Sequence, residues 1–92
     1  MTELSAMLKS EKTVIIDVRS PQEYMGGHVA GSINIPVNEI PERLDDIKKL
    51  GQIVLCCASG GRSGQAATFL KQNNIACING GSWTNVNFYK NN

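Results

Sequence analysis

Short apolar runs alternate with polar and glycine-rich stretches along this chain. Three of them, at residues 13–16, 53–56 and 75–78, are rich in Ile, Val or Cys and end at polar or glycine-containing segments. Runs of this length and composition are typical of buried strands. A less apolar run at 32–35 ends at Pro36 and predicts a short fourth strand.

The segments between these runs carry helical signals. Apolar residues recur every three or four positions at 4–8, 41–50 and 62–73, and each segment is predicted to form a helix. Residues 20–25 open with a serine and a proline and have a glutamate three positions after the serine, which predicts a short helix with a capping box. Asn74 is expected to end the helix predicted at 62–73 by adopting a left-handed conformation.

The order of these elements predicts the fold class. Strands that alternate with helices through short connections favour an α/β fold, with a mostly parallel central sheet and helices on both faces. The glycine pair in residues 79–81 predicts a turn, and residues 82–92 a loop with a short final helix. A chain of 92 residues is expected to form one domain, over residues 1–92.

Composition and charge narrow the function classes. Hydrophobic residues make up 41% of the chain and the net charge is +1, without a basic cluster, so no nucleic-acid partner is expected. No apolar run approaches the ~18 residues of a membrane span, so no membrane partner is expected either. The first residues lack the basic and apolar regions of a signal peptide. A cytoplasmic location follows as the expectation, with the periplasm as the alternative if a leader has been removed.

Three cysteines are an odd number for a disulfide framework and favour a working thiol. A bond between the neighbours Cys56 and Cys57 would be strained. Cys56 and Cys77 lie inside apolar runs and are expected to be buried structural thiols. Together with His28 the cysteines show no metal-ligand spacing, so neither a metal nor another cofactor is expected.

Cys57 stands at a different kind of position, between the apolar run at 53–56 and the helical segment at 62–73. Ligands of parallel sheets bind at the carboxyl ends of the strands. A thiol near a helix N-terminus and an arginine becomes a thiolate more easily, and the thiolate is the nucleophile. Glycines let the backbone amides of a loop turn toward an anion, and the arginine side chain adds a fork of donors. Cys57 is therefore the predicted nucleophile.

The residues after Cys57 are predicted to bind the substrate. They form the loop and the first position of the helix: Ala58, Ser59, Gly60, Gly61 and Arg62. The hydroxyls of Ser59 and Ser63 can add hydrogen bonds. Arg62 is expected either to bind an anion or to close the loop.

Several other polar or aromatic residues are expected to be structural. Asp17 and Arg19 are expected to pair with each other or with loop backbone, and His28 to fix a turn. Trp83 is expected to pack against the domain.

The distance from cysteine to arginine separates two chemistries. Phosphatases of the tyrosine-phosphatase type place five residues between them, whereas here four residues separate Cys57 from Arg62. The loop from Cys57 to Arg62 is therefore one residue shorter and forms a smaller ring of backbone amides. A ring of this size suits a sulfur atom bound to cysteine better than a phosphate. A phosphatase or arsenate reductase is therefore the less favoured class.

Residues 57–63 resemble the active-site loop of the rhodanese family, which comprises thiosulfate and related sulfurtransferases. Residues 17–36, which include Asp-Val-Arg, Glu-Tyr and Gly-His-Val-Ala-Gly, resemble its N-terminal signature. Gly80 and Gly81 followed by Trp83 resemble its C-terminal signature. The three stretches occur in order and together span most of the chain.

This resemblance implies sulfur transfer in two steps. Cys57 would take the outer sulfur of a donor such as thiosulfate and become a persulfide, and cyanide or a thiol would then remove that sulfur. The amides of residues 58–62 would stabilise the persulfide. A protein thiol is an alternative acceptor, and a regulatory or sulfur-carrier module that serves a protein partner is the alternative function. Ala58 leaves the loop with one fixed positive charge, so modest affinity for thiosulfate is expected.

Overall fold

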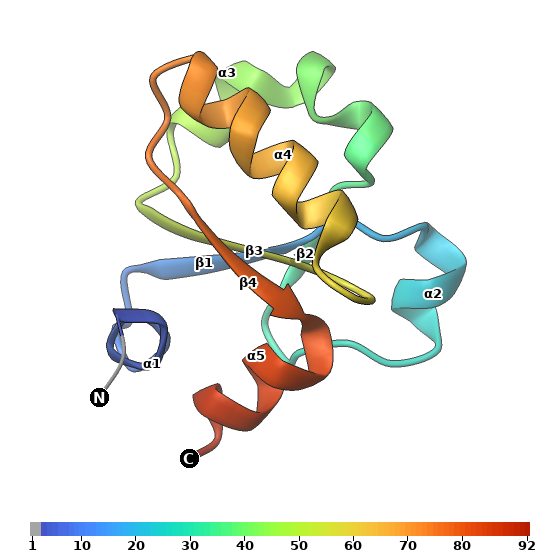
Figure 1. Cartoon of the computed structure of the whole chain (residues 1–92), viewed down its shortest axis with the longest axis vertical. Helices are drawn as coiled ribbons and strands as arrows, with labels where there is room; N and C mark the ends of the chain where they lie inside the picture. The colour runs from blue at the N-terminus through green and yellow to red at the C-terminus, as the bar shows by residue number, and fades with distance from the viewer. Residues whose placement is uncertain (1–2) are drawn as a thin grey trace.

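The computed structural model describes residues 3–92, which contain one parallel sheet with the strand order β2-β1-β3-β4 (Figure 1). The strands are β1 (Thr13–Asp17), β2 (Ile33–Asn34), β3 (Gln52–Cys57) and β4 (Ile78–Ser82). Each neighbouring pair is parallel. The α/β class expected from the sequence is confirmed.

Helices cover both faces of this sheet. Figure 1 shows α1 (Glu3–Leu8) and α5 (Trp83–Lys90) on one face, and α3 (Leu44–Lys48) and α4 (Gly61–Gln72) on the other. The helix α2 (Pro21–Met25) lies beyond the carboxyl end of β1, on the same side as the loop that joins β3 to α4.

The pleat of β3 divides the apolar core between these two faces. Successive side chains of a strand point to opposite sides of a sheet. Leu55 and Cys57 therefore belong to the cluster under α4, whereas Val54 and Cys56 belong to the cluster under α1 and α5. The two adjacent cysteines consequently lie in different layers.

The start of α2 and the end of α4 follow the sequence signals. Ser20 and Glu23 form the predicted capping box at the start of α2. At the end of α4, Asn74 has a φ of 64°. The amides of Asn74 and Ile75 donate to the carbonyls of Lys71 and Leu70 at 3.1 and 2.9 Å, which is the Schellman arrangement.

The predicted strand at 75–78 is misplaced. Ile75 completes the Schellman motif, so the strand begins only at Ile78 and runs through the glycines that had predicted a turn. A Cβ on Gly80 would lie 2.6 Å from a methyl of Val86 and 2.9 Å from one of Val54. Gly80 thus serves the close approach of α5 to β3 rather than a turn.

Two further segments differ from the predictions. The helix predicted at 41–50 is divided into the 3-10 helix η2 (Pro41–Arg43) and the short α3, and a further 3-10 helix, η1 (Val37–Glu39), precedes it. The final segment is more regular than the predicted loop, because Ser82 caps α5 by accepting a hydrogen bond from the Asn85 amide.

Candidate active site

Cys57 is the last residue of β3 and lies directly beneath the loop that leads into α4. Its side chain is 1% exposed, but Ala58 and Ser59 above it are exposed, so the sulfur lies just below the surface. Gly60, the N-cap of α4, has a φ of 102°, a conformation that residues with a Cβ rarely adopt. The chain can therefore turn sharply over the sulfur and enter the helix.

The Cys57 sulfur accepts hydrogen bonds from the start of α4. The Gly60 amide donates at 2.9 Å and the Ser63 hydroxyl lies 3.3 Å away. Burial raises the pKa of Cys57, but the Ser63 hydroxyl and the amides of Ser63, Gly60 and Ser59 outweigh it and lower the pKa to about 7. Near neutral pH a large fraction of Cys57 is therefore thiolate.

Asn79 on β4 holds this loop in place, a role that the sequence did not predict. Its Nδ2 donates to the Gly60 carbonyl at 3.1 Å, while its Oδ1 accepts from the Gly81 amide at 3.0 Å and from the Ser63 hydroxyl at 2.7 Å. The single hydroxyl hydrogen of Ser63 can serve Asn79 or the Cys57 sulfur, but not both at once. Only the pairing of β4 with β3 brings Asn79 to the loop.

Arg62 closes the loop against α2. Its NH1 and NH2 donate to the two carboxylate oxygens of Glu23 at 2.7 and 3.0 Å. This ion pair agrees with the loop-closing role expected for Arg62, while its binding of a substrate stays a prediction. Glu23 was predicted as a capping residue and belongs to the Glu-Tyr pair of the N-terminal signature, but its contact with Arg62 was not predicted.

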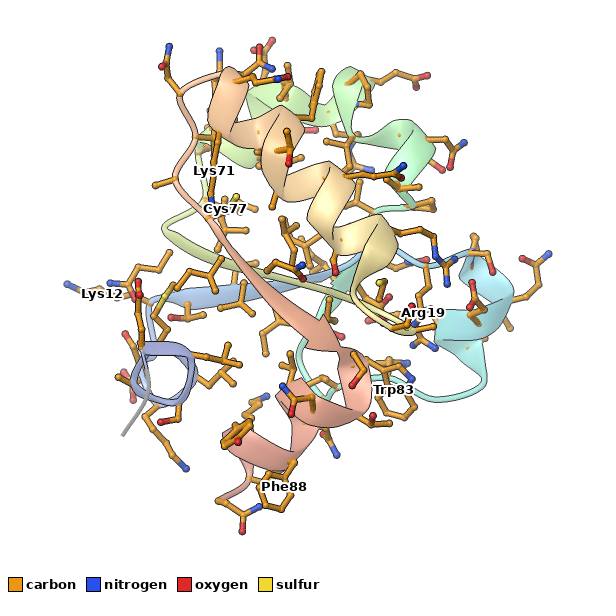
Figure 2. The ribbon with its side chains drawn as sticks, in the orientation of Figure 1. Lys12, Arg19, Lys71, Cys77, Trp83 and Phe88 are labelled. Carbon is orange, nitrogen blue, oxygen red and sulfur yellow. The ribbon has the colours of Figure 1, made fainter. Side chains whose placement is uncertain are left out.

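A second ion pair lies at the carboxyl end of β1. Arg19 donates to both oxygens of the buried Asp17 carboxylate, at 2.8 Å for the shortest contact, and to the Gly27 carbonyl at 2.6 Å. This confirms the predicted pairing. The guanidinium also lies 5.0 Å from the Trp83 ring centre, and Figure 2 shows the two side chains together.

His28 and Trp83 have the structural environments expected for them. The His28 ring stacks on Tyr24 with 3.7 Å between ring centroids, and its Nδ1 lies 2.6 Å from the Tyr24 carbonyl oxygen. Trp83 packs against the apolar cluster under α1 and α5.

The other two cysteines are unsuited to nucleophilic chemistry. Cys56 is fully buried, and burial, reinforced by the charge of Asp17, raises its pKa to about 12. Cys77 is 8% exposed and burial raises its pKa. Figure 2 shows Cys77 at the other end of the sheet from Arg19 and Trp83. The prediction of two buried structural thiols is confirmed for their burial, although Cys77 precedes β4 instead of lying within a strand.

Two cavities lie away from Cys57. One, of about 260 Å³, is lined by residues that include Ile53 and Cys77, and the other, of about 210 Å³, by residues that include Ile40 and Phe69. Within residues 3–92 no three His, Cys, Asp or Glu side chains are grouped to hold a metal ion. No helix in the same part of the chain has the length and apolarity to cross a membrane.

The Cys57 loop thus combines a thiol of lowered pKa with a ring of neutral donors. A thiolate stabilised in this way can attack an electrophilic sulfur atom and hold the product as a persulfide. No side chain acting as a general base is needed, because the thiolate already forms near neutral pH.

Comparison with known proteins identifies the class to which this fold and loop belong. The sequence model of the rhodanese-like domain matches residues 1–87. The chain therefore belongs to the rhodanese-like domain family, as its motifs had indicated.

Individual relatives agree with this assignment. The chain is 35% identical over 63 residues to a sulfurtransferase of Allochromatium vinosum, and 41% identical over 59 residues to the thiosulfate sulfurtransferase PspE of Escherichia coli. These alignments cover 68% and 62% of this chain and 59% and 57% of the two relatives, so the chain spans about three fifths of their length. A solved rhodanese with anions from E. coli superposes with a TM-score of 0.72 and 34% identity, covering 79% of this chain and 89% of that one.

Proposed function

We propose that this protein is a sulfurtransferase that carries sulfane sulfur on Cys57 as a persulfide. The observation that carries the proposal is the Cys57 sulfur within hydrogen-bond distance of the Gly60 amide and the Ser63 hydroxyl, with its pKa lowered to about 7. Membership of the rhodanese-like family and relatives named as sulfurtransferases support it. These names favour an enzyme over a non-turnover module.

The first step loads Cys57. The thiolate attacks the outer sulfur of a donor such as thiosulfate, a new S–S bond forms at Cys57, and the S–S bond of the donor breaks. Sulfite leaves with the bonding electron pair, and no proton or external oxidant is required. The negative charge on the terminal sulfur of the persulfide is stabilised by the loop amides, with the positive end of α4 behind them.

The second step returns the enzyme to its starting state. A thiophilic acceptor, either cyanide or a thiol, attacks the outer sulfur of the persulfide. The Cys57–sulfur bond breaks and its electron pair restores the thiolate. With cyanide the product is thiocyanate, and the rate of thiocyanate formation measures turnover.

Serine substitutions of the three cysteines test this assignment. We expect Cys57→Ser to lose thiocyanate formation from thiosulfate or methanethiosulfonate and cyanide by more than a hundredfold, because a serine hydroxyl is not ionised near neutral pH. Cys77→Ser, whose thiol lies at the other end of the sheet, should retain most of the activity. Cys56→Ser, which changes the neighbouring thiol, is the second control and should also retain activity. Full activity in Cys57→Ser would show that the reacting thiol has been wrongly assigned.

A further inference from the structure

Glu23 neutralises the only arginine of the Cys57 loop. Its two oxygens bind NH1 and NH2 of Arg62, and Oε1 also accepts from the amide and the hydroxyl of Ser20 at 3.1 Å each. The hydrogen bond from Arg62, aided by Ser20, lowers the pKa of Glu23 to about 2. Glu23 is therefore ionised throughout the neutral pH range and the Arg62 charge is continuously balanced.

The second arginine near the site is balanced in the same way. Arg19 binds both oxygens of Asp17 and also interacts electrostatically with Glu23. Arg62 interacts electrostatically with Cys57 and with Asp17. The four side chains form one group of two positive and two negative charges, so their net charge is zero.

This balance leaves the thiolate to be stabilised by neutral donors. The Gly60 amide and the Ser63 hydroxyl act on the sulfur at short range. The Coulomb energy between a donor molecule and the site is proportional to the donor's charge. A second negative charge on a donor is therefore repelled by the thiolate without a free arginine charge to offset it.

We propose that Glu23 is a specificity-determining residue that makes this site favour monoanionic or neutral sulfur donors over the thiosulfate dianion. The inference rests on the proposed sulfur transfer by Cys57. The favoured class comprises organic thiosulfonates and persulfides. With a thiosulfonate, Cys57 bonds to the outer sulfur, the S–S bond of the donor breaks, and a sulfinate leaves with the electron pair.

Two donors that differ by one charge test the proposal. Thiosulfate and methanethiosulfonate both present an outer sulfur to the thiolate, the first as a dianion and the second as a monoanion. The measurement is the ratio of their kcat/KM values. A changed fraction of folded protein or of thiolate affects both donors equally, so it cancels from this ratio.

Glu23→Gln removes the charge and keeps an amide oxygen for the capping box of α2. We expect the thiosulfate to methanethiosulfonate ratio to rise roughly tenfold at low salt, since the released Arg62 charge attracts the dianion more strongly than the monoanion. The increase should shrink at high ionic strength.

Arg62→Gln removes the positive charge of the same ion pair and is the control for Glu23→Gln. It leaves Glu23 unpaired, so the ratio should fall below that of the wild type. The double variant removes both charges and should return the ratio close to the wild-type value. A purely structural role of the pair would lower activity toward both donors alike.

The outcomes separate this inference from the proposed function. An unchanged donor ratio in Glu23→Gln, with both donors active, would overturn the role of Glu23 and leave sulfur transfer intact. Failure of the wild-type protein with both donors would instead overturn the proposed function.

Discussion

Two adjacent cysteines in this protein have opposite chemical properties. Cys56 lies in the core with a pKa raised to about 12, mainly by burial, whereas Cys57 has a pKa lowered to about 7. Both residues expose almost no surface, and burial raises the pKa of each thiol. The difference arises because the pleat of β3 turns Cys57 toward the start of α4, where Gly60 and Ser63 supply hydrogen-bond donors.

The pH dependence of alkylation measures this difference. We expect the rate at which iodoacetamide modifies Cys57 to rise with pH and to reach half its maximum near pH 7, because the thiolate is the reacting form. Ser63→Ala should raise that midpoint. At pH 6 the rate should fall roughly tenfold, since a hydrogen bond to a charged group contributes about 1.5–3 kcal/mol.

Thr68→Ala is the control for Ser63→Ala. It removes a hydroxyl from the same helix, where that group donates to the Gly64 carbonyl, and it should leave the midpoint near pH 7. An unshifted midpoint in Ser63→Ala would mean that the Ser63 hydroxyl remains with Asn79 when Cys57 ionises.

The Asp17–Arg19 pair is a buried ion pair, so its removal is expected to affect stability. Asp17→Ala leaves Arg19, which is 5% exposed, without its carboxylate and should lower the free energy of unfolding by about 3–5 kcal/mol. Asp46→Ala breaks the exposed pair with Arg43 and should cost less than about 1 kcal/mol. Urea unfolding of both variants gives the comparison, and similar small losses would contradict the importance of the buried pair.

At the scale of elements, the sequence correctly predicted those strands and helix ends that depend on interactions between residues close in the sequence. The β-branched run of β1, the apolar run of β3, the capping box of α2 and the left-handed Asn74 depend on neighbours in the sequence, and each was predicted. The start of β4 was not predicted correctly. The amide of Ile75 bonds to the end of α4, so the strand begins only at Ile78, and the role of Gly80 depends on its contact with α5.

Gly80 carries the prediction at this scale. Gly80→Ala places a Cβ 2.6 Å from Val86, 2.9 Å from Val54 and 3.1 Å from the Leu55 carbonyl oxygen, so α5 must move away from β3. We expect a loss of about 1–3 kcal/mol in the free energy of unfolding, typical of overpacking. Gly26→Ala is the control: its nearest contact would be 3.5 Å and its φ is −77°, so stability should hardly change. Equal stability of the two variants would contradict the close approach of α5.

At the scale of the whole molecule, the parallel topology assembles the site from distant segments. The pairing of β4 with β3 brings Asn79 to the loop that follows Cys57, and α2 adds Glu23. The sequence predicted Cys57 and its loop from their order along the chain. It did not predict Glu23 or Asn79 as site residues, because their partners lie 39 and up to 19 positions away and no local pattern marks such pairs.

Sulfur loading of Cys57 is the central claim, and intact-mass spectrometry after exposure to methanethiosulfonate tests it most directly. We predict a gain of one sulfur atom, mapped to Cys57 by peptide analysis, removed by cyanide and absent from Cys57→Ser. The same gain in Cys57→Ser, or a wild-type protein that gains no sulfur, would contradict the account.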